Sequence, residues 1–168
     1  MPPSVVLIGS PGAGKSTVGR RVAEKMGVPF ADTDALIEAA AGMSVSDIFV
    51  TLGEDEFRAL EADAVARALE EREGVLSLGG GAVLREETRS RLADVRVVWL
   101  RVTASDAASR VGLNTARPLL LGNVRATLSS LLEQRNPIYA EVATDVVDTS
   151  GRSLREVTEE VLWVVRDE

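Results

Sequence analysis

The stretch GSPGAGKS, residues 9–16, constrains the fold of this chain more than any other part of its sequence. It matches the phosphate-binding pattern G-x-x-x-x-G-K-[ST], with the apolar run VVLI before it and an amphipathic segment after it. In such a strand–turn–helix unit, backbone N–H groups at the helix N-terminus converge on an anion. A chance glycine loop is the alternative, but every fixed position of the pattern is present. We therefore predict an α/β fold with a nucleotide-binding P-loop.

The P-loop pattern also assigns roles to individual side chains. Lys15 is expected to reach the β- and γ-phosphates, and the Ser16 hydroxyl is expected to bind Mg²⁺. The residues of this segment expected to contact the nucleotide are Gly12, Ala13, Gly14, Lys15, Ser16 and Thr17.

The composition limits the chemistry that the chain can perform. Its 168 residues suffice for one domain with a sizeable core. It contains no cysteine and no histidine, which excludes the usual zinc sites and the commonest general base. Proton transfer is left to carboxylates, to Lys15 or Lys25, or to the single tyrosine, Tyr139. The formal net charge of −7 argues against a nucleic-acid partner, and no segment is apolar enough to span a membrane. We expect a cytoplasmic protein.

Short apolar runs alternate with segments of helical periodicity along the chain. The predicted strands are Val5–Ile8, Pro29–Asp32, Val75–Leu78, Val95–Val102 and Asp145–Asp148. The predicted helices are Lys15–Met26, Thr33–Ala41, Val45–Leu52, Glu54–Glu71, Glu86–Ala93, Ala104–Val111, Arg125–Ala140 and Ser153–Val165. This alternation predicts one domain, residues 1–168, with a parallel sheet covered by helices on both faces. The strand order cannot be derived from the pattern. Residues 112–124, with two glycines, a proline and an arginine, are predicted to form a mobile loop.

Two aspartates follow the second predicted strand, in the stretch FADTDALI. If this segment is extended, Asp32 and Asp34 point to the same side, near the end of a strand where ligands bind in open α/β sheets. One carboxylate can then hold Mg²⁺, directly or through water, while the other accepts a proton. Asp32 can instead be a helix N-cap, but that explains only one member of the pair.

Three consecutive glycines, Gly79–Gly81, follow the third predicted strand, although the P-loop already supplies a phosphate cradle. With the P-loop, the Asp-x-Asp pair and an arginine-bearing loop, in this order, they make the chain resemble shikimate kinase, a P-loop small-molecule kinase of the nucleoside-monophosphate-kinase-like type. The resemblance covers nearly the whole length and is strongest in GSPGAGKSTVGRRVA, DTDALIE, GEDEFRALE, LSLGGGAV, NTARPLL and QRNPIYAEVA. It implies a three-layer P-loop kinase fold with a five-stranded parallel sheet and a mobile lid. ATP and Mg²⁺ are the implied cofactors, and shikimate the implied acceptor.

The same resemblance implies that the Gly79–Gly81 turn lines the acceptor pocket. The backbone at Gly80 can approach a small ring because no Cβ intervenes. A tight turn after a buried strand is the alternative. Phe49 and Phe57 are the implied walls of the ring pocket, and both could simply belong to the core.

Two arginines are the implied clamps of the acceptor carboxylate. Arg58 and Arg135 would grip it, and Glu61 would fix the orientation of Arg58. By spacing alone, Arg58 and Glu61 would instead form a helix-surface ion pair of little energetic weight.

The implied lid comprises residues 112–124 and carries Arg117, which would reach the nucleotide and the transferring phosphoryl group. An ordinary surface loop with a solvated arginine is the alternative. Arg152, in DTSGRSLREV, is the implied contact on the adenine side. Arg110 would face the nucleotide too, or be a solvated helix residue.

On this resemblance we expect ATP-dependent phosphorylation of the shikimate 3-hydroxyl, a step of chorismate and aromatic amino-acid biosynthesis. Asp34 would orient that hydroxyl and accept its proton, while Lys15, Mg²⁺ and Arg117 offset charge on the transferring group. A kinase for another polyol acid, such as gluconate, is the nearest alternative. A GTPase-type switch would need a guanine-reading N-K-x-D motif, which the chain lacks. A bare binding module would not need two clamp arginines and an acceptor carboxylate. A monomer is expected.

Overall fold

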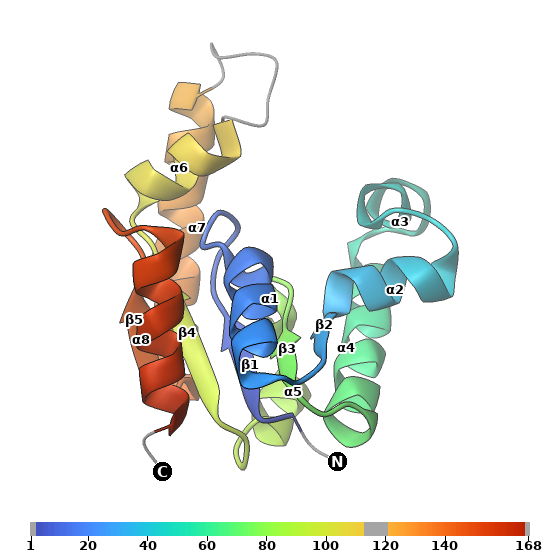
Figure 1. Cartoon of the computed structure of the whole chain (residues 1–168). Coiled ribbons are helices and arrows are strands. Elements are labelled where there is room, and N and C mark those ends of the chain that lie inside the picture. Colours follow the sequence, from blue (N-terminus) through green and yellow to red (C-terminus); the bar gives the residue numbers. More distant parts are fainter. Residues whose placement is uncertain (1–2, 113–120, 167–168) are drawn as a thin grey trace.

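A five-stranded parallel sheet forms the centre of the molecule (Figure 1). The structure is a computed structural model, and it describes residues 3–112 and 121–166. The strand order is β2-β3-β1-β4-β5, and all four pairings are parallel. The strands are β1 (Val5–Ile8), β2 (Phe30–Asp32), β3 (Val75–Ser77), β4 (Val97–Arg101) and β5 (Asp145–Asp148). The predicted parallel sheet is confirmed.

Helices cover both faces of this sheet, as predicted. They are α1 (Lys15–Met26), α2 (Thr33–Ala41), α3 (Val45–Leu52), α4 (Glu54–Glu71), the 3₁₀ turn η1 (Ala82–Leu84), α5 (Glu86–Arg91), α6 (Ala104–Gly112), α7 (Leu121–Val142) and α8 (Leu154–Arg166). Helices α1 and α8 lie on one face, and α4, α5 and α7 on the other (Figure 1). The sequence of β1 is a continuous apolar run because both of its faces are buried. Val5 and Leu7 belong to the core under α1 and α8, whereas Val6 and Ile8 belong to the core on the opposite face.

The segment predicted as a loop over residues 112–124 is partly helical, which corrects that prediction. Gly112 is the last residue of α6, and α7 begins at Leu121 rather than at Arg125. Apolar residues at positions 121, 124 and 128 continue the helical spacing upstream of the predicted start. Residues 113–120, which include Arg117, lie outside the described residues.

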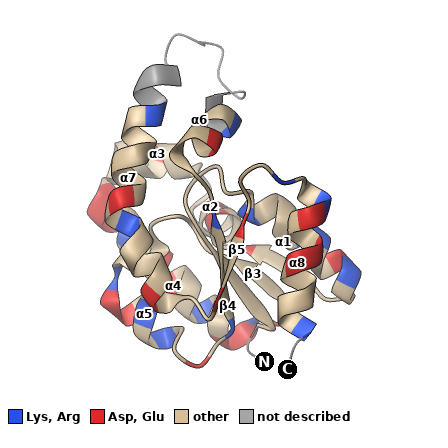
Figure 2. Cartoon of the chain, turned by 90° about the vertical axis from the view of Figure 1, so that its left-hand side faces the viewer, with Lys and Arg blue, Asp and Glu red and all other residues tan. Residues whose placement is uncertain are grey.

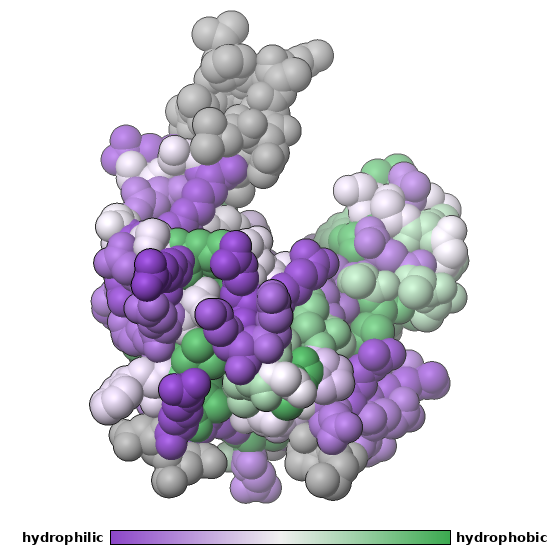
Figure 3. Space-filling model, viewed as in Figure 1, coloured by the Kyte–Doolittle hydropathy of each residue, from purple (hydrophilic) through white to green (hydrophobic). Residues whose placement is uncertain are grey.

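The topology brings three functional segments to one edge of the sheet. Because the strands are parallel, the P-loop after β1, Asp32 at the end of β2 and the Gly79–Gly81 turn after β3 all lie at the carboxyl ends of adjacent strands. Ser77 pairs with both Leu7 and Asp32, so these strand ends lie level. Figure 3 shows the molecule hollowed between the lobe of α2 and α3 and the part that carries α6 and α7.

The outer helices carry mixed charges. Figure 2 shows basic and acidic residues side by side on α4, α5, α7 and α8. This mixture is unlike the single basic face of a nucleic-acid-binding domain. Over residues 3–112 and 121–166, no single helix has the length and apolarity to cross a membrane, although α2 and α3 meet those two requirements as a pair bent by 60°.

Candidate active site

A cavity of about 480 Å³ opens where the central strands end. The P-loop, Asp32, Asp34 and the start of the glycine turn line it. Helix α1 begins at Lys15 without a side-chain cap and without an acidic residue in its first turn. The N–H groups of that first turn are therefore left for an anionic ligand. This arrangement fits the phosphates of a nucleotide.

Lys15 lies folded over the P-loop. Its ammonium group donates to the carbonyl oxygens of Gly9 at 2.8 Å and of Ser10 at 3.1 Å. Burial lowers the pKa of Lys15 to about 8, and the carboxylates of Asp34 and Asp32 oppose that shift. The lysine thus sits between the phosphate cradle and the aspartate pair.

The aspartate pair is formed differently from the prediction. The segment is not extended through both residues: Asp32 is the N-cap of α2, with φ −124° and ψ 126°, and Asp34 lies in the first helical turn. The Asp32 carboxylate accepts a hydrogen bond from the Asp34 N–H at 2.8 Å. The N-cap interpretation is therefore correct for Asp32, and the cap itself holds the two carboxylates at one place.

Ser16 and Asp32 offer oxygen atoms that suit Mg²⁺. The Ser16 hydroxyl is hydrogen-bonded to the Asp32 carboxylate across the cavity wall. In the part of the chain that the structure describes, no cluster of three or more acidic side chains could hold a metal alone. This donor set fits Mg²⁺, which commonly takes one or two protein oxygens and fills its shell with phosphate oxygens and water.

Gly79 lies between two carboxyl groups. A Cβ at this position would lie 2.8 Å from both Asp34 Oδ1 and Glu61 Oε2. Its N–H donates to the hydroxyl of the buried Thr33 at 3.0 Å, a contact that sequence reasoning missed. Burial is the main cause that raises the pKa of Asp34 and of Glu61, and the Asp32 carboxylate adds to the rise at Asp34.

Gly80 and Gly81 lie against two guanidinium groups. A Cβ on Gly80 would lie 3.2 Å from Arg135 Nη1, and one on Gly81 would lie 2.6 Å from Arg58 Nη2. None of the three glycines of the turn has a positive φ. A tight turn alone therefore does not require them. The glycines leave room for charged side chains from α2, α4 and α7, which a Cβ at these positions would force to shift.

Arg58 is held in place from two sides. Its Nη1 donates to Glu61 Oε1 at 2.8 Å, and Glu61 is only 3% exposed, so the alternative of a helix-surface ion pair is wrong. The guanidinium carbon lies 5.9 Å from the ring centre of Phe49 and 5.3 Å from that of Phe57. The two rings lie 4.6 Å apart, with Phe57 in a small core between α2, α3 and α4. Both phenylalanines thus border Arg58 while also serving this core.

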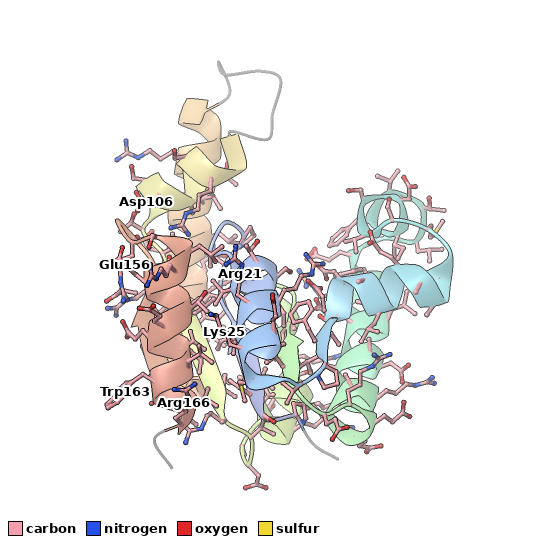
Figure 4. All side chains as sticks on the ribbon, viewed as in Figure 1. Arg21, Lys25, Asp106, Glu156, Trp163 and Arg166 are labelled. Atoms are coloured by element: carbon pink, nitrogen blue, oxygen red, sulfur yellow. The ribbon has the colours of Figure 1, made fainter. Side chains whose placement is uncertain are left out.

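Arg110 lines the same cavity and bridges the P-loop and the turn between β5 and α8. It donates to the Gly12 carbonyl at 2.9 Å and to the Thr149 carbonyl at 3.0 Å, so the alternative of a solvated helix residue is wrong. Asp106, labelled on α6 in Figure 4, accepts from the Gly151 N–H at 3.1 Å. These contacts fasten α6 to the β5–α8 turn beside the cavity.

Arg152 lies in the same turn but is directed toward α8. It donates to the Asp148 carbonyl at 2.8 Å and pairs with Glu160. Its contact with a nucleotide stays a prediction. The role of Arg117 also stays a prediction, because that residue lies outside the described ranges.

Comparison with known proteins agrees with this geometry. A family model described as shikimate kinase matches residues 11–166. The chain belongs to the shikimate kinase family. A shikimate kinase of Thermobifida fusca is 60% identical over 157 residues, which is 94% of this chain and 91% of that protein. The solved structure of shikimate kinase from Acinetobacter baumannii in complex with shikimate has a TM-score of 0.89 at 33% identity, covering 99% of this chain and 93% of that one.

The gluconate alternative is also represented among the solved structures. A gluconokinase from Sinorhizobium meliloti matches with a TM-score of 0.63 at 26% identity, covering 98% of this chain and 92% of that one. It shares the fold at a clearly lower similarity. As a member of the shikimate kinase family, the chain is a kinase with the predicted P-loop fold, and ATP and Mg²⁺ are its cofactors.

Proposed function

We propose that this shikimate kinase family member transfers the γ-phosphoryl group of ATP to the 3-hydroxyl of shikimate. One observation carries the proposal: the turn Gly79–Gly81, beside the phosphate cradle, is faced by the Asp34 carboxylate and by the guanidinium groups of Arg58 and Arg135. Two guanidinium forks suit a planar carboxylate, and a carboxylate base suits a hydroxyl. An acceptor that carries both groups, as shikimate does, fits this set.

Each residue has a distinct task in the proposed reaction. Arg58 and Arg135 hold the acceptor by its carboxylate, and Asp34 orients the hydroxyl and accepts its proton. The raised pKa of Asp34 makes it a better proton acceptor than an exposed aspartate. Lys15 places positive charge against the transferring phosphoryl group, a task that the family resemblance also gives to Arg117. Bound Mg²⁺, held by Ser16 and Asp32, would neutralise charge on the phosphates.

The proposal also covers the domain organisation, the oligomeric state, the partners and the location of the protein. Residues 1–168 would act as one domain and as a monomer, with no nucleic-acid or membrane partner. A cytoplasmic location, where ATP is available, suits a kinase of aromatic amino-acid biosynthesis.

An assay of ADP release tests the function directly. The purified protein is given ATP and Mg²⁺ with shikimate, with gluconate, or with no acceptor. We expect turnover with shikimate, little with gluconate, and slow background hydrolysis alone. Turnover with gluconate and none with shikimate would favour the gluconate alternative. Equal slow hydrolysis in all three reactions would contradict the acceptor site.

Arg58→Ala tests the carboxylate clamp. We expect the dissociation constant for shikimate to rise by about ten- to a hundredfold, because a charge-assisted hydrogen bond to the acceptor is lost. The affinity for ATP should stay within about twofold of the parent, since Arg58 is on the acceptor side of the site. Calorimetric titration with each ligand measures both. The melting temperature should also fall, because the buried Glu61 loses its ion-pair partner.

A matched control lies on the same helix. Arg67 pairs with Asp63 on the outside of α4, with the side chains 71% and 63% exposed. Arg67→Ala should leave both affinities unchanged.

Arg135→Ala should weaken shikimate binding as Arg58→Ala does, and the two losses should be less than additive because both arginines grip one carboxylate. Unchanged shikimate binding in both variants would refute the clamp.

A further inference from the structure

Tyr139 is a buried polar residue to which the proposed reaction gives no task. It lies on α7 with no exposed surface, and its ring centre is 5.7 Å from that of Trp99 in the core behind the sheet. The hydroxyl is the only polar group of this buried side chain. That hydroxyl donates to the Gly80 carbonyl at 2.6 Å. A side chain of the core is therefore bonded directly to the glycine turn.

Arg135 lies one helical turn before Tyr139, on the same face of α7. Its guanidinium lies beside the turn, where a Cβ on Gly80 would be 3.2 Å from Arg135 Nη1, and it interacts electrostatically with the tyrosine hydroxyl. A hydroxyl can accept one hydrogen bond while it donates another, so Tyr139 can join Arg135 to the Gly80 carbonyl. Burial raises the pKa of Tyr139, although Arg135 opposes this, so the hydroxyl keeps the proton that it donates.

The carbonyl groups of the turn are all satisfied inside the protein. The three bonds run from Ala82 N to Gly79 O at 3.1 Å, from Tyr139 Oη to Gly80 O at 2.6 Å, and from Leu84 N to Gly81 O at 3.1 Å. Within residues 3–112 and 121–166, no partner contacts the N–H of Gly80 or of Gly81. The three carbonyl oxygens of the turn are therefore bonded within the protein, and the N–H groups of Gly80 and Gly81 are left to bind a ligand. Tyr139 is the side chain that holds the middle carbonyl.

Loss of that bond would change what the turn presents. A peptide unit is planar, so its C=O and N–H point in opposite directions and rotate together. If the Gly80 carbonyl is released, the peptide between Gly80 and Gly81 can turn, and a carbonyl oxygen can then face the acceptor. Such an oxygen repels a carboxylate, whereas an N–H attracts it.

We propose that Tyr139 is a positioning residue for the acceptor carboxylate. Its hydroxyl holds the peptide between Gly80 and Gly81 and the Arg135 guanidinium in orientations in which both donate hydrogen bonds to that carboxylate. This inference rests on the proposed function, because it takes the carboxylate of shikimate as the ligand of these donors. It gives Tyr139 a part in specificity for an anionic acceptor, without contact with the reacting atoms.

Tyr139→Phe is the direct test, because it removes only the hydroxyl and keeps the ring against Trp99. The dissociation constants of parent and variant are measured for shikimate, for the uncharged methyl ester of shikimate, and for ATP. We expect the constant for shikimate to rise about tenfold, with those for the ester and for ATP within about twofold of the parent. The preference for the acid over the ester should therefore fall about tenfold. In combination with Arg135→Ala, the loss should be less than additive.

Thr158→Val provides the matched control. Thr158 lies in α8, and its hydroxyl is buried without a hydrogen-bond partner among the described residues. Its removal should leave all three constants unchanged. If Tyr139→Phe only lowers the melting temperature, or weakens acid and ester equally, the hydroxyl has a structural role and the inference is wrong. If the parent itself neither binds nor phosphorylates shikimate, the proposed function fails first, and this inference fails with it.

Discussion

Lys15→Ala is expected to lower turnover by about a thousandfold or more. Lys15 is the lysine of the P-loop, and its ammonium lies over the carbonyl groups of Gly9 and Ser10 at the mouth of the phosphate cradle. When the γ-phosphoryl group transfers, this charge stabilises the developing negative charge more than it stabilises bound ATP. Turnover should therefore fall further than ATP affinity. Single-turnover rates and calorimetric titration with ATP separate the two effects.

The chain offers a clean control for this substitution. Its other lysine, Lys25, is exposed near the end of α1, well away from the P-loop (Figure 4). Lys25→Ala should keep parental activity. Lys15→Met, which retains most of the side-chain volume, should lose as much turnover as Lys15→Ala if charge is the cause. Near-parental activity in both Lys15 variants would show that the P-loop does not act as a catalytic phosphate cradle here.

Much of the fold follows from local sequence patterns. The bounds of β1, β5 and α1 through α4 agree with the predicted ones because apolar periodicity and helix-capping residues act over a few positions. The strand order did not follow, because β3 pairs with β1 and β2 through contacts between residues far apart in the chain. That order matters for function, since it places the turn after β3 directly beside the P-loop.

The sequence predicted which residues belong to the site, but not how they are arranged in space. Glu61 shares its helix face with the buried residues Phe57 and Val65, four positions before and after it, so this spacing was a usable signal that Glu61 is buried. Spacing could not reveal that the glycine turn covers it, because that contact joins residues far apart in the chain. The extended geometry assumed for Asp34 was wrong because the N-cap at Asp32 starts the helix one residue later. Tyr139 was named only as a possible proton carrier. Its spacing of four residues from Arg135 was a usable signal that the two share a helix face.

Asp34→Asn is expected to lower turnover by about two to four orders of magnitude, the usual contribution of a positioned general base. The amide keeps the size of the side chain, and the backbone N–H that bonds to Asp32 is unchanged. What is lost is the proton acceptor. The chain has no histidine, so no imidazole can take the proton instead. Single-turnover rates with saturating ATP and shikimate measure the effect.

The pattern of binding decides whether Asp34 serves the acceptor or the nucleotide. Asp34 faces Gly79 in the acceptor turn, whereas Asp32 bonds to Ser16 of the P-loop. ATP affinity should therefore stay within about threefold of the parent when Asp34 is replaced, because the phosphate contacts are intact. Asp63→Asn, on the outside of α4 where the side chain is 63% exposed and pairs with Arg67, removes a carboxylate far from the site and should leave the chemical step unchanged. If Asp34→Asn weakens ATP binding while the single-turnover rate is preserved, Asp34 belongs to the metal or nucleotide site, and the proton acceptor must be sought elsewhere. Glu61 is then the next carboxylate to test, since it lies on the other side of Gly79.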